Sequence, residues 1–341
     1  MQRIAVLLLA CTLSLAASEV VNLYTYSEYI DPDIPAQFAK ATGLELKIDV
    51  YESQEEMLAR LQAGGLAEYD VLIISDVTIP GLVAQKFVQP LDYTKIPNAV
   101  NLMPSFKGLE FDAANTYSLP YLWGPIGIAY RKGSLPDGFG WKSLLDPEQM
   151  PGPVVLMDEM RTMMGCVLIA QGKDPNTTDK ATLVEAGKVL LKAKASDKCL
   201  GFDGGVGALN KVLAGQAVAA VVYNGDAVRA MSESDEITFA IPAEGSLSAI
   251  DNLLISAKAK NVAGAHAFIN YIYDAKVGAQ NANYIQYATP NQASLELITP
   301  DDRANPAIYP PLEMMSKLKN LKALGADEQL FEQVWQAIKA R

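Results

Sequence analysis

The segment VNLYTYSEYIDPDIPAQFAKATG (residues 21–43) carries the pattern from which the fold of the chain can be predicted. Its β-prone start predicts a strand, and IPAQFAKAT, followed by a glycine, predicts a helix. Three tyrosines, Tyr24, Tyr26 and Tyr29, lie around the end of the strand. Loops are usually small and polar, so these rings either pack in a core or line a binding site.

Strands and helices continue to alternate after this segment. LELKIDVY (44–51) and YDVLIIS (69–75) predict strands, and SQEEMLARLQAGG (53–65) predicts a helix that opens with a Ser-x-x-Glu capping box. Near-continuously apolar strands between helices are typical of parallel sheets covered on both faces. A second group of such elements begins near residue 126. We therefore expect an α/β fold of two lobes, with crossing strands as a hinge and a cleft between the lobes.

The first eighteen residues (1–18) have the layout of a secretory signal peptide, with one arginine, an apolar run and then small residues. The apolar run is too short for a membrane-spanning helix. Lipid attachment at Cys11 is an alternative, although cleavage there would leave an unusually short signal. We expect a periplasmic mature chain of about 320 residues, which is long enough for two cores.

The formal net charge is −11 at pH 7, and removal of residues 1–18 makes it −12 because one arginine is lost. Such a surface repels nucleic acid and anionic lipid and favours cations. Many soluble proteins are acidic, so the charge alone does not identify a ligand.

Cysteine and histidine usage excludes several kinds of site. Cys166 and Cys199 remain after signal removal and fit no CxxC or metal-ligand pattern; a disulfide and two buried thiols both stay open. The single histidine, His266, lies in the apolar-periodic segment VAGAHAFINYIYDA, which favours a packing role. One such histidine supports neither a Ser-His-Asp triad nor a multi-histidine metal site, and we expect no metal or cofactor.

The predicted strands end in a recurring set of tyrosines and carboxylates with little basic charge. These residues are Tyr26, Ser27, Tyr29, Ser75, Asp76, Asp158, Glu159, Arg161, Thr162, Tyr223, Asn224, Asp226, Asp251 and Tyr287. A desolvated ammonium group needs charge-assisted hydrogen bonds to carboxylates, and aromatic faces add cation–π attraction. Because ligands of open α/β sheets bind beyond strand ends, the set predicts a site for a small organic cation.

Each of these residues also has a structural interpretation. An Asp or Ser after a strand is commonly a helix cap, which suits Asp76 and Asp158 best. Tyrosines at strand ends commonly pack at a core edge, and Tyr24, inside its strand, is expected to do so. Asp251 differs, because it interrupts the apolar run AIDNLLIS near the start of a strand, where an unpartnered carboxylate is costly.

Several segments, taken in order, resemble the periplasmic spermidine/putrescine-binding proteins of ABC importers. They are LYTYSEYI, YESQEEMLARL, YDVLIIS, YSLPYLWGPIGIAY, LAGQAVAAVVYNGDA, AKNVAGAHAFINYI and YATPNQAS. The resemblance covers essentially the whole mature chain. It implies a type II periplasmic-binding fold with mixed, mostly parallel sheets. Lobe one would comprise residues 19–124 and 250–297, and lobe two residues 125–249 and 298–341.

The resemblance also implies which residues form the site. The predicted ligand-binding residues are Tyr26, Ser27, Tyr29, Ser75, Asp76, Glu159, Thr162, Tyr223, Asp226, Asp251 and Tyr287. Asp251 matches the carboxylate that grips an amine, and Asp226 matches a carboxylate used in putrescine-type proteins. Glu28 has no part in the family pattern, so we expect it to serve the turn.

The chain departs from the family pattern at several of these positions. Tyr26 and Tyr223 replace tryptophans, and Val77 and Ala249 stand where large aromatic residues are common. Thr162 stands where spermidine-type proteins carry a glutamate. With thinner walls and one acid fewer, the pocket is expected to take a different or bulkier cation, and the choice between putrescine and spermidine stays open.

We therefore expect a monomeric solute receptor, not an enzyme, that delivers a polyamine to an ABC permease. One alternative is a binder of another solute in the same fold. A carboxylate-bearing ligand would need Arg161, unless this residue pairs with Asp158 or Glu159. The other alternative is an exported hydrolase with two carboxylates, Glu159 with Asp226 or Asp251.

Overall fold

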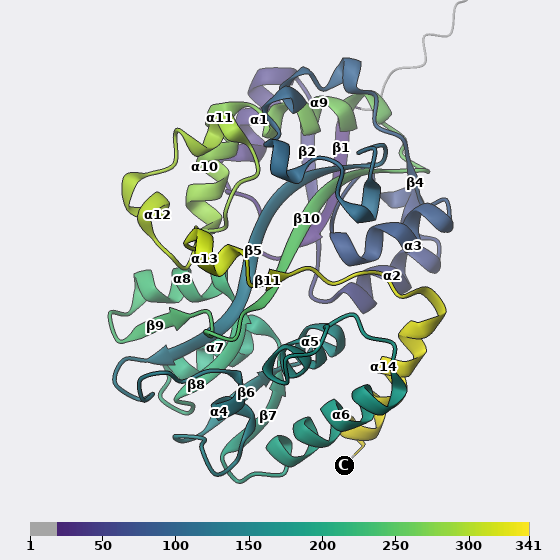
Figure 1. Ribbon diagram of the computed structural model, residues 1–341. Coiled ribbons are helices and arrows are strands. Elements are labelled where there is room, and N and C mark those ends of the chain that lie inside the picture. Colours follow the sequence, from purple (N-terminus) through teal and green to yellow (C-terminus); the bar gives the residue numbers. More distant parts are fainter. Residues whose placement is uncertain (1–18, 341) are drawn as a thin grey trace, which may run out of the picture.

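The computed structural model describes residues 19–340, so the predicted signal peptide and Cys11 lie outside the described residues. Two halves are joined by the long strands β5 (Ser118–Arg131) and β10 (Ser246–Ser256), which run side by side from one half to the other (Figure 1). These two strands are antiparallel neighbours. The expected α/β fold with crossing strands between two lobes is confirmed.

The strands form one eleven-stranded sheet within residues 19–340, with the main order β2-β1-β3-β10-β5-β8-β6-β7. The other strands are β1 (Val20–Tyr26), β2 (Glu45–Tyr51), β3 (Val71–Ser75), β4 (Val88–Gln89), β6 (Val154–Met157), β7 (Cys199–Asp203), β8 (Ala219–Tyr223), β9 (Ile237–Ala240) and β11 (Leu318–Lys319). Strand β1 is parallel to β2 and β3, and β6 is parallel to β7 and β8. The antiparallel pairs all involve β5 or β10, so parallel strands form the body of each half.

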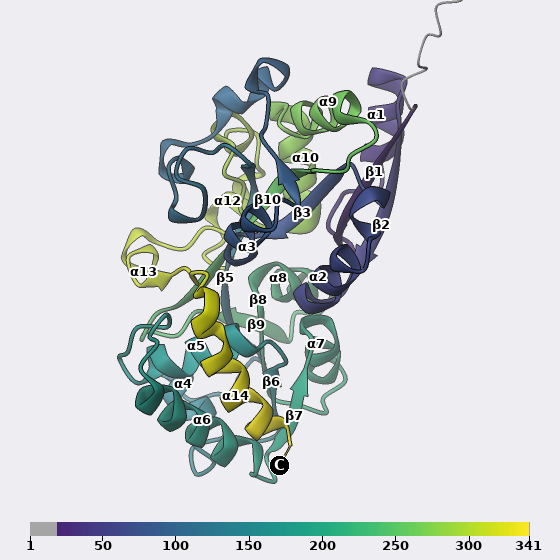
Figure 2. The same ribbon diagram turned by 90° about the vertical axis from the view of Figure 1, so that its right-hand side faces the viewer.

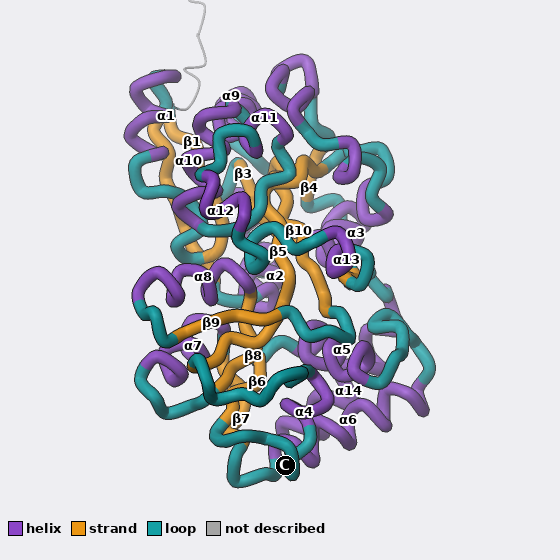
Figure 3. Tube along the Cα trace, turned by 60° about the vertical axis from the view of Figure 1, so that its left-hand side comes forward, coloured by secondary structure: helices purple, strands orange, loops and turns teal. Residues whose placement is uncertain are grey.

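Helices surround the strands in both halves (Figure 3). The α-helices of residues 19–340 are α1 (Ile34–Thr42), α2 (Gln54–Gln62), α3 (Ile79–Ala84), α4 (Trp141–Leu145), α5 (Met160–Ala170), α6 (Lys180–Lys194), α7 (Gly205–Leu213), α8 (Asn224–Glu233), α9 (Val262–Ile272), α10 (Ala275–Ile285), α11 (Gln292–Leu295), α12 (Pro300–Ala304), α13 (Leu312–Met315) and α14 (Glu328–Lys339). The predicted cap of α2 is confirmed, because Ser53 Oγ accepts a hydrogen bond from the Glu56 backbone N–H at 3.1 Å.

Alternating side chains bury both faces of the sheet in the half that holds β1 to β3. On β3, Val71 and Ile73 pack in the same core as α1, α9 and α10, whereas Leu72 packs with α2 and α3 on the other face. Tyr24 is fully buried on that second face and stacks on Tyr69 with ring centroids 4.2 Å apart. Its predicted packing role is confirmed.

The other half repeats this arrangement around β6 and β8. On β8, Ala219 and Val221 pack in a core with α4, α5, α6 and α14, whereas Ala220 and Val222 pack with α7 and α8. The C-terminal helix α14 lies along α5 and α6, as the side view shows (Figure 2). The last helix of the chain therefore stabilises this half.

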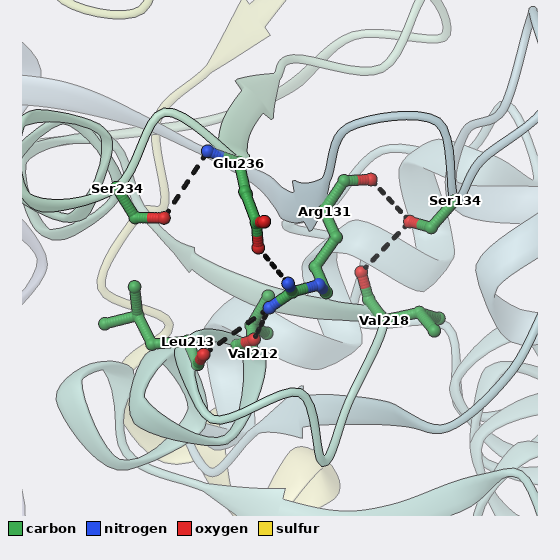
Figure 4. A network of polar contacts seen from close by, with 7 residues as sticks. All are labelled: Arg131, Ser134, Val212, Leu213, Val218, Ser234 and Glu236. Atoms are coloured by element: carbon green, nitrogen blue, oxygen red, sulfur yellow. Dashed lines mark hydrogen bonds and ion pairs between the residues drawn. The ribbon is translucent and has the colours of Figure 1, made fainter.

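A polar network fixes α7 against the end of β5 (Figure 4). Arg131, the last residue of β5, forms an ion pair with Glu236 and donates to the backbone carbonyls of Val212 and Leu213. A guanidinium group at a helix C-terminus satisfies free carbonyls and is favoured by the helix dipole. The network thereby anchors the C-terminal end of α7; the other end of this helix borders the cleft described next.

Candidate ligand-binding cleft

A cleft between the halves consists of two chambers of about 530 and 580 Å³. The first chamber lies against the ends of β1 and β8, and the second extends toward α2, α3, α5 and α14. Four residues line both chambers and form a shared wall: Ser75, Glu159, Tyr223 and Ala249. Volumes of this size are typical of small-molecule sites.

All of the predicted site residues line this cleft. The first chamber is lined by Tyr26, Ser27, Tyr29, Ser75, Glu159, Tyr223, Asp226, Asp251 and Tyr287. The second chamber is lined by Ser75, Asp76, Glu159, Thr162 and Tyr223. The two halves contribute to both chambers, because Tyr26 and Ser75 end β1 and β3 and Tyr223 ends β8.

Strand pairing places Asp251 in the middle of the cleft. It lies on β10 between Ser75 of β3 and Leu122 of β5, and the β5–β10 register shifts directly after it. Such irregularities re-aim side chains and are common beside functional sites. Asp251 is thus held by the strands that join the two halves.

The Asp251 carboxylate has little stabilisation from the protein itself. It is 9% exposed, and within the described residues its one hydrogen-bond donor is Tyr29, with an O–O distance of 2.5 Å. Burial raises the pKa of Asp251 to about 7, the Tyr29 hydrogen bond opposes this shift, and the charge of Glu159 adds to it. A cation in the chamber would restore the lost stabilisation.

Glu159 forms part of the shared wall and is oriented by two hydroxyl groups. Its Oε2 accepts hydrogen bonds from Tyr223 at 2.6 Å and from Thr162 at 2.9 Å. Burial raises the pKa of Glu159, and these two hydrogen bonds lower it. Thr162, at the position where the family resemblance implied a glutamate, therefore orients the Glu159 carboxylate through a hydrogen bond.

A third carboxylate, Asp226, lies near an arginine that the sequence interpretation missed. Arg229 donates to Asp226 at 3.2 Å and to Glu28 of the opposite half at 2.6 Å. Burial raises the pKa of Asp226 to about 6, although the guanidinium group opposes the shift. Glu28 does adopt a left-handed turn conformation, with φ 54°, but it also bridges the cleft. The expected turn role is therefore confirmed, and the ion pair with Arg229 adds a second contact.

Tyrosine rings line the first chamber on several sides. The Tyr29 ring contacts three others: its centroid lies 5.5 Å from those of Tyr26 and Tyr287, which also line the chamber, and 5.7 Å from that of Tyr121 behind it in the core. Tyr51, at the end of β2, also lines the chamber, and its ring centroid lies 4.4 Å from that of Tyr26. The sequence analysis did not single out this residue. The walls thus offer π faces to a bound cation.

The contact between the halves is tight around Tyr287. A Cβ atom at Gly225 would lie 1.8 Å from Tyr287 Cε2, so a residue other than glycine cannot be accommodated without movement. Gly225 belongs to the first turn of α8. The Asn-Gly-Asp segment therefore brings α8 and Asp226 close to the opposite half.

The end of β7 and the first turn of α7 also border the first chamber and were not predicted. Residues 203–207 line it, with three glycines that leave backbone exposed. Asp203 is paired with Lys211 at 2.6 Å, so its charge is already neutralised. This region could have been found only through the glycine-rich sequence FDGGVG, which spans the junction of β7 and α7.

Three structural interpretations of charged residues need correction. Asp158 does not cap α5; it pairs with Lys339 at 2.7 Å. Arg161 pairs with Glu328, through two contacts of 2.9 and 2.7 Å, rather than with Asp158 or Glu159. Arg161 is also not the one arginine at the cleft, because Arg229 lines the first chamber.

Asp76 resembles Asp251 in its environment. It is 2% exposed and accepts hydrogen bonds from Ser75 Oγ at 3.0 Å and from the Val77 N–H at 2.9 Å, within its own turn. Burial raises the pKa of Asp76 to about 7, against these hydrogen bonds. Its carboxylate lines the second chamber and stabilises the turn after β3.

The remaining chemistry-bearing residues have structural roles. Cys166 is buried in α5 and Cys199 lies in β7; both are free thiols, and burial raises the pKa of each. His266 contacts the Val262 carbonyl through Nδ1 and accepts from the Asp92 N–H through Nε2, as a packing role predicts. Within residues 19–340 no group of His, Cys, Asp and Glu could hold a metal ion, and no helix is long and apolar enough to cross a membrane.

Comparisons with known proteins agree with this geometry. The family model of the bacterial extracellular solute-binding proteins matches residues 34–310. The chain is 31% identical to spermidine/putrescine-binding periplasmic protein 1 of Haemophilus influenzae, over 95% of this chain and 90% of that protein.

Solved structures are similar over the same extent. A structure from Listeria monocytogenes has a TM-score of 0.86 and 33% identity, covering 94% of this chain and 99% of that one. The spermidine/putrescine ABC transporter substrate-binding protein of Streptococcus pneumoniae has a TM-score of 0.82 and 27% identity, covering 95% and 99%. The chain therefore belongs to the bacterial extracellular solute-binding proteins, with their type II periplasmic-binding fold.

Proposed function

We propose that this protein captures a polyamine in the periplasm and delivers it to an ABC permease of the inner membrane. The observation that carries this proposal is the environment of Asp251, a buried carboxylate with one hydrogen bond and no ion pair among the described residues. Glu159 and Asp226 add two more acids to the same chamber. A neutral or anionic solute would leave Asp251 and Glu159 without a compensating positive charge.

Polyamine chemistry fits the chamber in two respects. An ammonium group at Asp251 would form a charge-assisted hydrogen bond, worth about 1.5–3 kcal/mol. The methylene groups would lie against the rings of Tyr26, Tyr29 and Tyr287, whose faces also attract cations. The names of the relatives from Haemophilus and Streptococcus support the same ligand class.

Ligand capture would couple to closure of the two lobes. We assign residues 19–124 and 250–297 to lobe one and residues 125–249 and 298–341 to lobe two, with β5 and β10 as the hinge. A ligand that contacts Asp251 and Glu159 touches both lobes, so it favours the closed state over the open one. The closed monomer would then present the surface that the permease recognises, and no bond in the solute is made or broken.

A thermal-shift screen of the mature protein tests this function. Putrescine, cadaverine, spermidine, spermine and agmatine are compared with amino acids at equal concentration. A ligand at one hundred times its Kd adds about 2.7 kcal/mol to the unfolding free energy. We expect stabilisation by one or more amines, and its loss in Asp251→Asn; the absence of a shift with every amine would overturn the proposed ligand class.

A further inference from the structure

Tyr29 reaches Asp251 from a loop and not from a helix or a strand. The loop comprises residues 27–33, between β1 and α1, and it turns at Glu28 with a left-handed φ of 54°. Loop backbone lacks the regular hydrogen bonds that fix helices and strands, so it is more mobile. The place of the Tyr29 hydroxyl, 2.5 Å from the Asp251 carboxylate, therefore depends on contacts that other elements make with this loop.

Two buried side chains from other elements hold this loop. Tyr121 of β5 donates from its hydroxyl to the Tyr29 backbone carbonyl at 2.8 Å. Asn281 of α10 donates from Nδ2 to the Tyr121 hydroxyl at 2.6 Å and accepts from the Asp31 backbone N–H through Oδ1 at 3.0 Å. Tyr121 is 5% exposed and Asn281 is 1% exposed. A continuous chain of hydrogen bonds thus joins α10 and β5 to the loop that carries Tyr29.

The direction of each hydrogen bond in this chain is set at Asp31. A backbone N–H group can only donate, so the Asp31 N–H requires the oxygen atom of the Asn281 amide. Nδ2 of Asn281 then faces Tyr121, whose oxygen accepts, and the single hydroxyl hydrogen of Tyr121 remains for the Tyr29 carbonyl. Loss of either side chain would leave a buried partner without its hydrogen bond.

We propose that Tyr121 and Asn281 are positioning residues for ligand binding, because they hold the Tyr29 backbone where its hydroxyl can donate to Asp251. This inference rests on the proposed function and adds to it two residues that lie behind the chamber wall. Neither of them lines the two chambers, so their effect on a ligand has to pass through Tyr29.

Tyr121→Phe is the first test, because it removes only the hydroxyl group and keeps the ring, whose centroid lies 5.7 Å from that of Tyr29. We expect putrescine and spermidine to bind about threefold more weakly at pH 6.5 in isothermal titration calorimetry, as for the loss of one hydrogen bond. Asn281→Leu, which removes the amide at similar size, should act in the same direction.

Tyr273→Phe is the matched control. Tyr273 is 2% exposed, and its hydroxyl donates to the backbone carbonyl of Pro120, directly before Tyr121 on β5. The substitution removes a buried hydroxyl–carbonyl hydrogen bond of the same kind in the same core. It should lower the melting temperature about as much as Tyr121→Phe does and preserve the amine affinity.

A double-mutant cycle with Tyr29→Phe separates positioning from a general loosening of the fold. If Tyr121 acts through the Tyr29 hydroxyl, Tyr121→Phe should cause no further loss of affinity in the Tyr29→Phe protein. A general loosening would add its full threefold loss there.

The pH profile of amine affinity gives a second readout that a structural role alone would not change. The Tyr29 hydrogen bond lowers the pKa of Asp251, so Tyr29→Phe and Tyr121→Phe should each move the midpoint of the rise in affinity to higher pH. Tyr273→Phe should not move it. The other cleft carboxylates with a raised pKa, Glu159, Asp76 and Asp226, are the same in every variant, so a moved midpoint reports on Asp251.

Unchanged affinity in both Tyr121→Phe and Asn281→Leu would overturn the inference. A loss that adds in full to that of Tyr29→Phe, or a midpoint that stays in place, would also overturn it. Each of these results leaves the proposed function intact, because the unmodified protein still binds an amine. The absence of amine binding by the unmodified protein would overturn both.

Discussion

Two buried aspartates lie at opposite ends of the β3–β10 strand pair and differ in what surrounds them. Asp70, directly before β3, is 1% exposed and accepts hydrogen bonds from the backbone N–H groups of Asn22, Lys260 and Asn261 at 2.8–2.9 Å. It also accepts from the Asn22 side chain at 3.2 Å. Asp251, opposite Ser75 at the other end, has the single hydrogen bond from Tyr29.

The difference separates a carboxylate that stabilises the fold from one to which we assign ligand binding as a proposal. Four donors replace the water that Asp70 lost on folding, and they tie β1 and α9 to the start of β3. The environment of Asp251 replaces little of that water, so its compensation has to come from outside the chain. Burial alone does not reveal which role a carboxylate has; the count of donors does.

The largest expected effect is on stability at Asp70. Asp70→Ala removes the acceptor of three backbone N–H groups in a buried site, and each unsatisfied group costs about 1–3 kcal/mol. We expect the unfolding free energy to fall by about 3–5 kcal/mol in urea titrations. Polyamine affinity of the fraction that folds should remain unchanged. A loss below about 1 kcal/mol would show that these hydrogen bonds are not structural.

Asp251→Asn should weaken ligand binding and leave the stability of the fold intact, the opposite of Asp70→Ala. We expect at least tenfold weaker amine binding in calorimetry, because one charge-assisted hydrogen bond is lost. The unliganded protein should be equally stable or more stable at pH 8, since the amide removes a buried, poorly solvated charge. Tyr29→Phe, which removes the single donor but keeps the ring, is the matched control and should weaken binding less. Unchanged affinity in Asp251→Asn would remove this residue from the site.

The stability of the unliganded protein should depend on pH through Asp251 and Asp226. The pKa values of about 7 for Asp251 and about 6 for Asp226 lie above the value near 4 of an unfolded chain. The folded, unliganded protein therefore binds more protons than the unfolded chain between about pH 4 and pH 7. The contribution of these groups to stability is present below pH 4 and is lost as the pH rises through this window.

Ligand binding should have the opposite pH dependence, because a cation requires ionised carboxylates. We expect amine affinity to rise at least tenfold between pH 5.5 and pH 8. Calorimetry measures the affinity and thermal unfolding measures the unliganded stability at the same pH values. Parallel changes in the two quantities would contradict the assignment of raised pKa values to the ligand site.

The smallest effect is expected at the ion pair between Glu28 and Arg229. This pair crosses the cleft but is partly exposed, with side chains 67% and 33% accessible, so its interaction energy should be about 0.2–1 kcal/mol. A double-mutant cycle of Glu28→Gln and Arg229→Gln on amine binding measures it. The coupling should shrink at high salt. A coupling above about 2 kcal/mol would make this pair, and not Asp251, the main determinant of closure.

Local patterns predicted much of the fold and of the site. The strand–helix alternation, the Ser53 cap and the packing of Tyr24 follow from neighbours in sequence. Strand ends and motif resemblance led to eleven residues that all line the cleft. Asp251 could be singled out because a carboxylate interrupted an apolar strand.

What the sequence could not predict depends on contacts between distant residues. Glu28 and Arg229 are 201 positions apart, and Arg161 and Glu328 are 167 apart. No local pattern indicates which of several charged residues will meet after folding. The division of the cleft into two chambers has the same origin, because residues from both halves line each chamber.

The most direct test is calorimetry of putrescine and spermidine at pH 6.5 in two buffers of different ionisation enthalpy. With a pKa of about 7, much of Asp251 is protonated before binding and ionised afterwards. We predict one bound ligand with release of roughly half a proton or more, and a clear decrease of that release in Asp251→Asn. Tight binding with no proton release, and with the same affinity in Asp251→Asn, would contradict the assignment of Asp251 as the carboxylate that holds the cation.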